Sequence, residues 1–369
     1  MEVGRLIEAG LLAEDGLAKS EGGRRSSLLR IPRSAGLIAA VDLGATSTDV
    51  ALTTLGGELL IHRGESGDIK DGPRSVLDRV KEMLSELLAE QGADAQDVLA
   101  IGVGVPGPVE RATGVLRSPP IMPGWDGFPI RAAFADEYEA PVFVDNDVNV
   151  MALGEHRDGI GKGEDDVLFV KIGTGIGAGL VSRGALHRGA QGCAGDIGHV
   201  AVGESTIQCR CGQLGCLEAH AGGFALARDG QELARSGASA QLAQAVAGGR
   251  EVTAATVIHA AQRGDLAARE LVIHSARLVG EALARIVNFF NPSLILVGGG
   301  VASSGEMYLT ELRRSVLNRS LPLATRSLLI KQSPLADYAG LRGAAFMVVD
   351  ELLSLERLAA SDPEESTAR

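Results

Sequence analysis

The sequence predicts an α/β fold of two lobes around a cleft, because strand and helix signals alternate in both halves of the 369-residue chain. Glycine is abundant, at 49 residues, and three glycine-rich turns directly follow predicted strands. No apolar run approaches the roughly 18 residues that a membrane-spanning helix needs. The first residues also lack the apolar stretch of a signal peptide. We therefore expect a cytoplasmic α/β protein.

The composition excludes several classes of protein. With 45% hydrophobic and 22% charged residues, the chain is not collagen-like, wholly coiled-coil or wholly disordered. The 35 basic residues against 47 acidic ones give a net charge of −12, which excludes a basic nucleic-acid footprint over the whole surface but not a local one. Aromatic residues are only 3%, which argues against an aromatic carbohydrate groove or an RNA stacking platform. Four cysteines do not make a disulfide scaffold.

The segment at residues 1–35 differs from the rest, with six basic and five acidic residues. Helical spacing of apolar residues precedes Gly10, which is a candidate helix cap. A short strand, a basic turn at Gly22-Gly23-Arg24-Arg25 and a second strand are expected to follow. This order is typical of the back half of a winged helix. The alternative is a loose N-terminal extension.

The following residues predict a lobe of strands and one long helix. The expected strands are Leu37–Leu43, Asp49–Leu55, Glu58–Arg63, Val98–Val105 and Pro141–Val144. Residues Pro73–Gln91 form an amphipathic pattern that predicts a helix. Residues Ser118–Pro129, around Trp125, are rich in proline and glycine and predict a loop over a site. A helix is expected to run on from the last strand through Ala152.

The second half of the chain shows the same alternation of predicted strands and helices. Strands at Val167–Ile172 and Gly177–Val181 are expected to form a hairpin, followed later by a strand at Leu294–Val297. Helices are expected at Leu271–Phe290 and Leu341–Leu358. The predicted domains are a partial winged helix at 1–35, a small lobe at 36–145 completed by a helix at 338–358, a large lobe at 146–337 and a tail at 359–369.

Three glycine turns at strand ends are candidates for holding a phosphate chain. The first is Asp42-Leu43-Gly44-Ala45-Thr46, whose backbone N–H groups can cradle phosphate while the acid holds a hydrated Mg²⁺. The second is Gly173-Thr174-Gly175, which lies between two strands and so lacks the following helix of a dinucleotide fingerprint. The third is Gly298-Gly299-Gly300. Each turn alone has an ordinary structural explanation, and the set of three is more specific than any member.

The candidate catalytic cluster consists of carboxylates and an amide at the end of a predicted strand. In Val144-Asp145-Asn146-Asp147-Val148-Asn149, Asp147 could take a proton from a sugar hydroxyl, and Asn146 could orient that sugar. Ala152-Leu153-Gly154-Glu155 follow. The alternative is that Asp145 or Asp147 only caps the helix.

The most specific signal is a cluster of metal-ligating residue types. His199 precedes Cys209-Arg210-Cys211-Gly212 and then Cys216, which predicts a tetrahedral site of one imidazole and three thiolates for structural zinc. Free thiols or redox chemistry are the alternatives. Cys193 is expected to be a small buried side chain, and Asp196, three residues before His199, could share a ligand with it.

Together, these motifs resemble the ROK family of repressors, open reading frames and sugar kinases, from about Gly36 to Leu358. The three glycine turns likewise resemble the two phosphate loops and the adenosine turn of the sugar kinase–actin-like fold, which is ribonuclease H-like. The basic segment at 1–35 resembles the end of the family's winged-helix domain. A complete winged helix would need roughly 40 to 50 residues upstream, so we expect a wing without the DNA-reading helix.

The resemblance implies a set of functional residues. The sugar would be held by Gly107, Asn146, Asp147, Asp196, His199 and Glu218, converging on one pocket. In the family's kinases, the residue matching Asp147 is the base. ATP with Mg²⁺ would be held by Asp42, Gly44, Thr46, Gly173, Thr174, Gly175 and Gly299. The zinc ligands would be His199, Cys209, Cys211 and Cys216. Asp196 stands where the family usually has Glu, which leaves the identity of the sugar open.

Two functions follow from the resemblance. The first is a sugar-responsive transcriptional regulator that binds operator DNA, favoured by the segment at 1–35. The second is an ATP-dependent hexokinase or glucokinase, favoured by Asp147 and the phosphate turns. A protein with both functions is also compatible with the sequence. The resemblance further implies a homodimer.

Overall fold

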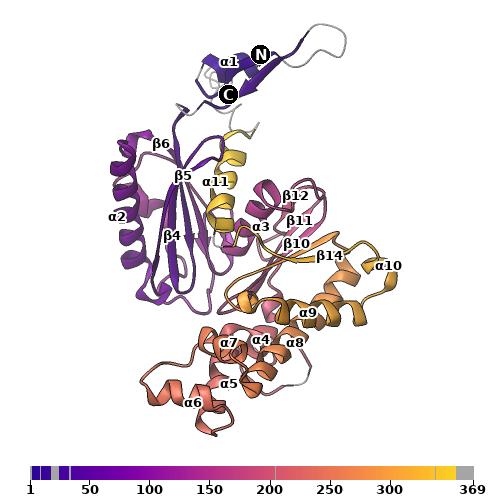
Figure 1. The fold of residues 1–369 in the computed structure, drawn as a ribbon. Coiled ribbons are helices and arrows are strands. Elements are labelled where there is room, and N and C mark those ends of the chain that lie inside the picture. Colours follow the sequence, from indigo (N-terminus) through magenta and orange to yellow (C-terminus); the bar gives the residue numbers. More distant parts are fainter. Residues whose placement is uncertain are drawn as a thin grey trace. The chain divides into compact units, whose positions relative to one another are not determined.

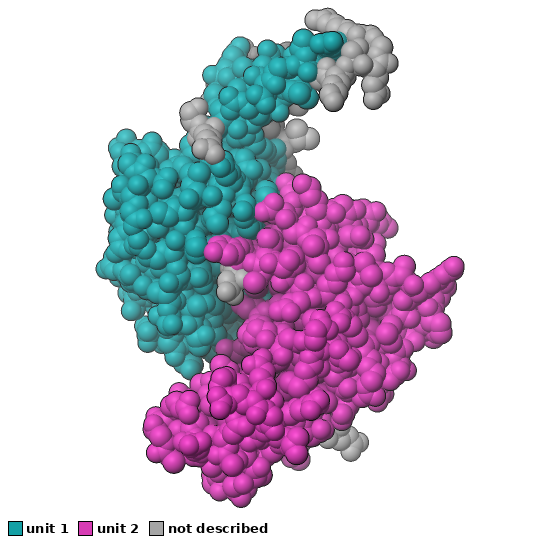
Figure 2. All heavy atoms as spheres, in the orientation of Figure 1, with its two compact units in different colours: residues 1–150, 340–369 teal, residues 151–339 magenta. Residues whose placement is uncertain are grey.

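The computed structural model describes residues 2–8, 10–17, 25–32, 35–203, 205–336 and 338–354. The chain divides into two compact units. Unit 1 comprises residues 1–150 and 340–369, and unit 2 comprises residues 151–339 (Figures 1 and 2). Residues 22–24 of the predicted basic turn and the predicted tail at 359–369 lie outside the described residues.

The N-terminal segment has the predicted order of helix, strand and strand. Helix α1 (Glu2–Glu8) is followed by Gly10, whose φ of 72° and N–H bond to the Ile7 carbonyl end the helix. Strands β1 (Ala13–Leu17) and β2 (Ser27–Arg30) pair antiparallel.

Unit 1 contains a mixed five-stranded sheet in the order β5-β4-β3-β6-β9. Its strands are β3 (Leu37–Leu43), β4 (Ser47–Thr54), β5 (Leu59–Ser66), β6 (Val98–Val105) and β9 (Val142–Asn146). The first three strands form an antiparallel meander, and β6 and β9 run parallel to β3. Therefore β3, β6 and β9 bring their carboxyl ends to one edge of the sheet.

Two helices cover opposite faces of this sheet (Figure 1). Helix α2 (Pro73–Gln91) starts on a proline and ends at Gly92, which has a left-handed φ of 67°. Its apolar face joins the buried core of β3, β4 and β6. Helix α11 (Tyr338–Leu352) lies on the other face, where the absence of a side chain at Gly102 lets the Ala344 carbonyl approach closely.

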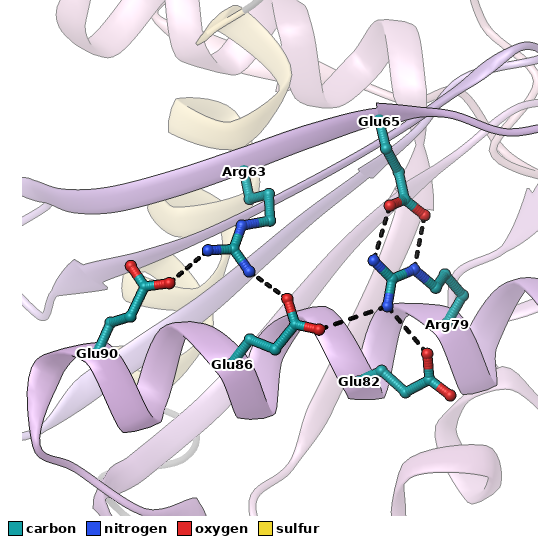
Figure 3. A network of polar contacts seen from close by, with 6 residues as sticks. All are labelled: Arg63, Glu65, Arg79, Glu82, Glu86 and Glu90. Carbon is teal, nitrogen blue, oxygen red and sulfur yellow. Dashed lines mark hydrogen bonds and ion pairs between the residues drawn. The ribbon is translucent and has the colours of Figure 1, made fainter.

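Ion pairs on the solvent side link α2 to the edge strand β5. Arg79 of α2 makes a bidentate contact with Glu65 of β5 at 2.8 Å and also pairs with Glu82 and Glu86 (Figure 3). Arg63 of β5 bonds to Glu86 and Glu90. Charged side chains on an edge strand discourage pairing with another chain.

The loop region of unit 1 is folded tightly. It contains η2 (Ile69–Asp71), η3 (Ala95–Asp97), β7 (Val109–Glu110), β8 (Val115–Leu116) and η4 (Ile130–Phe134). The predicted loop at 118–129 has no regular helix or strand. Trp125 is completely buried there and donates its indole N–H to the Ile69 carbonyl at 3.0 Å.

Unit 2 repeats the same sheet topology in the order β12-β11-β10-β13-β14. Its strands are β10 (Val167–Ile172), β11 (Ile176–Ser182), β12 (Ala185–His187), β13 (Leu294–Gly298) and β14 (Leu329–Gln332). Again three strands form an antiparallel meander and two run parallel to its first strand. The turns β3–β4 and β10–β11 therefore occupy equivalent places in the two units.

Helices complete unit 2. They are the second half of α3 (Asp147–Asp158), η5 (Ile197–His199), α4 (Leu217–Ala221), α5 (Gly223–Arg235), α6 (Ala240–Ala247), α7 (Ala254–Gln262), α8 (Leu266–Phe290), η6 (Ala302–Ser304), α9 (Glu306–Arg319) and α10 (Pro322–Thr325). The long helix starts at Leu266, five residues before the predicted start, because the Asp265 carboxylate accepts the Ala268 N–H at 3.0 Å and caps it.

Other sequence expectations need correction. Helix α3 continues to Asp158 instead of ending at Ala152. The last helix ends at Leu352 instead of continuing to Leu358; Leu353 and Ser354 are not helical, and later residues are not described. Cys193 is exposed, because it lies in an irregular loop rather than in the core. The sequence analysis predicts none of helices α4–α7, α9 and α10. Among the described residues, no helix is long and apolar enough to cross a membrane.

Candidate functional site

The first glycine turn joins β3 to β4 in unit 1. Asp42, near the end of β3, is only 8% exposed. The Gly44 N–H donates to the Ser47 carbonyl at 2.8 Å, which closes the turn. At Gly340, in the first turn of α11, an added Cβ would lie 1.8 Å from Asp42 Oδ2, so glycine leaves the space that this carboxylate occupies. A buried carboxylate beside a glycine turn has the donor chemistry that suits Mg²⁺.

Two buried carboxylates share one row of the sheet in unit 1. Asp42 of β3 is in register with Gly104 of β6, which is in register with Asp145 of β9. Gly104 contributes no side chain between them, and a Cβ there would lie 3.3 Å from Asp42 Oδ1. The first glycine turn and the predicted acid cluster are thus aligned at the same edge of the sheet.

Asn146 caps helix α3. Its side-chain oxygen accepts the backbone N–H groups of Val148 at 3.0 Å and Asn149 at 3.2 Å. Its amide donates to the Gly107 carbonyl at 3.0 Å, and Gly107 has a positive φ of 93°. Asn146 therefore fixes the loop after β6 to the start of α3. The N-cap of α3 is therefore the side chain of Asn146, which lies between Asp145 and Asp147, the two acids that the sequence offered as caps.

Asp145 and Asp147 lie on either side of the cap. Asp145 Oδ1 accepts the Asn146 N–H at 2.7 Å and the Asn149 side-chain amide at 3.0 Å. Asp147 begins α3, is 5% exposed, and accepts the Val148 N–H at 2.9 Å. Unit 1 thus brings together Asp42, Gly107, Asn146 and Asp147 at the carboxyl ends of β3, β6 and β9.

The second and third glycine turns meet in unit 2. The Gly173 N–H donates to the Gly175 carbonyl at 2.9 Å between β10 and β11. A Cβ at Gly299 would lie 2.6 Å from the carbonyl oxygen of Ile172, the last residue of β10. The turn after β13 therefore packs directly on the strand that leads into Gly173. These glycines permit the close approach of backbone to backbone.

The start of helix α5 is bonded to the same turn. The N–H groups of Gly223 and Phe224 donate to the carbonyls of Gly173 at 2.8 Å and Thr174 at 3.1 Å. The Arg210 guanidinium stacks 3.7 Å above the Phe224 ring. These contacts link the cysteine-rich loop to the glycine turn, and no sequence motif indicated them.

The predicted metal ligands come together in unit 2. One ligand atom from each of His199, Cys209, Cys211 and Cys216 lies within 4.8 Å of every other. The Cys209 sulfur is 3.6 Å from His199 Nδ1, and the sulfurs of Cys211 and Cys216 are 3.7 Å apart. One imidazole and three thiols in such a group form a donor set that fits tetrahedral zinc.

The backbone around this cluster forms a tight knuckle. The Cys209 N–H donates to the Gln213 carbonyl at 2.8 Å, and the Gly212 N–H donates to the Cys209 carbonyl at 2.9 Å. Gly212 and Gly215 have positive φ values of 90° and 74°. Burial raises the pKa of the Cys209 thiol to about 12 and also raises the pKa of Cys216. Zinc would displace the thiol protons on binding.

Glu218 contacts both the group of predicted metal ligands and the second glycine turn, Gly173-Thr174-Gly175. It lies in the first turn of α4, and its Oε2 accepts the Ile176 N–H at 3.2 Å. Its Oε1 lies 3.6 Å from the Cys209 sulfur. A Cβ at Gly175 would lie 2.3 Å from Oε2, so this glycine makes room for the carboxylate.

His199 presents its two ring nitrogens to different neighbours. Nδ1 faces Cys209, whereas Nε2 lies 3.8 Å from Asp196 Oδ1. Unit 2 therefore brings Asp196, the group formed by His199 and the three cysteines, and Glu218 into one region. The nitrogen that faces Cys209 and the nitrogen beside Asp196 are distinct, so one side chain connects two sets of groups.

A buried hydroxyl pair supports the helix that carries Glu218. Ser275 of α8 donates to the Ala221 carbonyl at the end of α4, at 2.7 Å. Its hydroxyl is also 3.1 Å from that of Tyr308 of α9, which is completely buried. Burial raises the pKa of Tyr308. Sequence patterns gave no signal for this pair, because the three residues are far apart along the chain.

Comparisons with known proteins agree with this geometry. A family model described as "ROK family" matches residues 38–351. A xylose repressor from Caldicellulosiruptor bescii is 30% identical over 354 residues, covering 96% of this chain and 88% of its own length. A glucokinase from Halalkalibacterium halodurans is 32% identical over 318 residues, covering 86% of this chain and 96% of its own length.

A solved structure extends the match in three dimensions. It is a ROK family transcriptional regulator described as a homolog of the E. coli MLC protein, with a TM-score of 0.79 and 25% identity. It covers 97% of this chain and 90% of its own. These matches confirm the predicted fold class and the predicted resemblance: the chain belongs to the ROK family.

Proposed function

We propose that this protein is a transcriptional regulator that responds to a monosaccharide. The proposal rests on the share of this chain that each match covers. The xylose repressor and the ROK regulator match 96% and 97% of the chain, whereas the glucokinase matches 86%. The regulator matches are long enough to include part of the segment at 1–35, which the ROK family model leaves out.

The sugar contacts are proposed residue by residue. In unit 1 they are Gly107, Asn146 and Asp147, and in unit 2 they are Asp196, His199 and Glu218. All but Gly107 offer polar side chains that suit sugar hydroxyls, and Gly107 offers backbone groups. His199, Cys209, Cys211 and Cys216 would hold structural zinc, which would fix the imidazole and so the ring nitrogen beside Asp196.

Calorimetric titration tests sugar binding. D-xylose and D-glucose are titrated separately into the full chain and into an Asn146→Ser variant. The serine hydroxyl keeps an oxygen that can cap α3 and adds no charge between Asp145 and Asp147, but it removes the amide that donates to Gly107, so a loss of binding is not a loss of the helix cap. We expect a binding heat with one of the sugars that weakens at least tenfold in the variant. No heat with a wider panel of hexoses, pentoses and amino sugars would contradict sugar binding.

A mobility-shift assay tests DNA binding through the N-terminal segment. The probe is the DNA upstream of the protein's own gene, and the competitor is the sugar found by calorimetry. Sugar-sensitive binding by the chain, or by a version extended upstream, supports a regulator. Sugar binding without a DNA shift in either version would overturn the regulatory role alone.

A second candidate, an ATP-dependent sugar kinase, is favoured by Asp147. This carboxylate is buried at the start of α3, at the same sheet edge as Asp42. Asp147 would accept the proton of a sugar hydroxyl, whose oxygen then attacks the γ-phosphate of ATP. Asp42, Gly44, Thr46, Gly173, Thr174, Gly175 and Gly299 would hold ATP and Mg²⁺.

An ADP-release assay over the same sugars decides between the two candidates. Turnover that Asp147→Asn abolishes, with sugar affinity retained, would establish a kinase. Turnover that survives this substitution would exclude Asp147 as the base. Sugar binding without ADP release would leave the regulator as the function of the chain.

A further inference from the structure

Glu155 is a buried acid that neither proposed function uses. It lies in the second half of α3, and its side chain is 0% exposed. One carboxylate oxygen, Oε1, accepts the Ser333 hydroxyl and the Leu335 backbone N–H, the latter at 3.1 Å. Within the described part of the chain, Oε2 has no hydrogen-bond partner. Burial of a carboxylate is costly, so its retention needs a structural reason.

The local sequence makes room for this carboxylate. A Cβ at Gly159 would lie 2.0 Å from Glu155 Oε2, and a Cβ at Gly161 would lie 3.0 Å from the Glu155 carbonyl oxygen. The N–H groups of both glycines donate to that carbonyl at 3.1 Å. The loop after α3 therefore closes over Glu155 and holds its side chain toward Ser333.

The partner of Glu155 is the short segment Ser333–Ala336, which connects β14 to α11. The Ser333 N–H donates to the Val297 carbonyl at 2.9 Å, which fixes the segment to the sheet of unit 2. The Ser333 hydroxyl also accepts the Ala336 N–H at 3.3 Å. Ala336 has a left-handed φ of 46°, which an alanine adopts only at an energetic cost. Glu155 thus stabilises a strained turn.

Both ends of this contact lie next to the points where the chain passes between the units. The chain leaves unit 1 between Val150 and Met151, within α3, and returns between Ala339 and Gly340, within α11. Glu155 follows the first passage by a little more than one helical turn, and Leu335 precedes the second by a similar number of residues.

We propose that Glu155 is a positioning residue that ties the two passages of the chain together. Through Ser333 and Leu335, it makes the second half of α3 and the start of α11 move as one body. Rotation of one unit against the other must then occur on the unit 1 side of this contact. Glu155 sets where the hinge lies, without touching the sugar or the metal.

Hydrogen exchange of the full chain, measured by mass spectrometry, tests this inference without any ligand. The variants are Glu155→Ala, Glu155→Gln and Ser333→Ala. The matched control is Ser320→Ala, because the Ser320 hydroxyl is also buried but has no partner among the described residues. Glu155→Gln keeps an oxygen that can accept the same two hydrogen bonds, so it serves as the conservative replacement.

We expect peptides covering residues 333–342 to exchange at least tenfold faster in Glu155→Ala and Ser333→Ala. Glu155→Gln should restore most of the protection, and Ser320→Ala should leave it unchanged. Peptides from β3 and β6 should not change in any variant. If Glu155→Ala does not fold, Ser333→Ala decides the question, since it leaves the carboxylate in place.

Two results would overturn the proposal. One is unchanged exchange at residues 333–342 in Ser333→Ala. The other is a uniform increase over all peptides, which would indicate loss of global stability rather than release of one segment. Neither outcome depends on sugar, DNA or ATP, so the inference can fail while the proposed function holds, and the reverse.

Discussion

His199 connects two groups of functional residues in unit 2 through the two nitrogens of one ring. Its Nδ1 faces the Cys209 sulfur and its Nε2 faces Asp196. A metal bound by the thiols and Nδ1 would fix the ring and with it the direction of the second nitrogen. The resemblance to the family implies Glu at the position of Asp196, and compared with Glu the shorter Asp side chain withdraws the carboxylate by about one methylene. The ligand specificity of this chain is therefore expected to depend on this position.

The cysteine cluster gives the first prediction. Cys209→Ser should lower bound zinc from one equivalent per chain to less than about a tenth, because the site needs all four ligands for tetrahedral closure. Cys193→Ser is the matched control, since that thiol is exposed and outside the cluster. Elemental analysis of the purified proteins measures the metal. Full zinc occupancy in Cys209→Ser, or loss of zinc in the control, would contradict the ligand assignment.

Gly340 gives a second prediction at the residue scale. Gly340→Ala places a methyl group 1.8 Å from Asp42 Oδ2, so we expect the free energy of unfolding to fall by about 1–3 kcal/mol. Gly4→Ala, in open space within α1, is the control and should be neutral or slightly stabilising. Urea denaturation measures both. The cost of Gly340→Ala should shrink in an Asp42→Ala background; an equal cost there would show that the carboxylate is not what the methyl group meets.

At the scale of the element, helix caps explain which helix bounds could be predicted from the sequence and which could not. The helix at Pro73–Gln91 was predicted with its correct bounds, because a proline starts it and a glycine ends it. Helix α8 starts five residues before the predicted Leu271, because its first turn, capped by Asp265, contributes only Ala268 to the buried face and so extends the apolar repeat weakly. Helices α4 and α6 span only 5 and 8 residues, too few for an apolar repeat to stand out, whereas α5 has a clear apolar face that predicts a helix.

Asp265 gives the element-scale prediction. Burial raises the pKa of this carboxyl, but bonds from the Ala268 N–H and the Ser239 hydroxyl outweigh it, so its pKa lies below the ordinary value. A lowered folded-state pKa contributes stability above the unfolded pKa, and this contribution is lost as pH falls through the folded pKa. Asp265→Ala should therefore cost about 1–2 kcal/mol at pH 7.

The pH dependence of that cost is the check. Urea denaturation of the parent and of Asp265→Ala is compared at pH 7 and at progressively lower pH. The difference between them should begin to narrow below about pH 4, where the carboxyl is protonated in the unfolded chain, and its charge-dependent part should vanish only below the lowered pKa of the folded parent. Asp94→Ala, at a short 3-10 helix on the surface, provides a matched cap removal with a smaller effect. A cost that is constant with pH would show that the charge of Asp265 is not involved.

For the whole molecule, the repeated sheet topology accounts for what could be predicted of the site. Each glycine turn and the acid cluster were identifiable because they directly follow buried strands, and parallel strands bring such residues to one edge. The grouping of the metal ligands followed from their spacing. The contacts of Glu218 with Ile176, and of Glu155 with Ser333, join residues 42 and 178 positions apart, which no local pattern encodes.

The two units also predict how the molecule unfolds. Each has its own sheet and its own buried core, and the metal cluster belongs to unit 2. The single tryptophan, Trp125, is completely buried in unit 1, so its fluorescence reports the unfolding of that unit alone. Far-ultraviolet circular dichroism instead follows the helices of both units. The two signals can therefore separate the units in one experiment.

Removal of zinc should change the circular dichroism transition more than the Trp125 fluorescence transition. In urea, with a chelator present, we expect part of the circular dichroism transition to move to lower denaturant while the Trp125 fluorescence midpoint stays within about 0.2 M of its original value. Cys209→Ser should reproduce this separation without the chelator, and added chelator should not increase it. Coincident shifts of both signals would mean that the units unfold as one cooperative body, because loss of the metal in unit 2 would then destabilise the core around Trp125 equally.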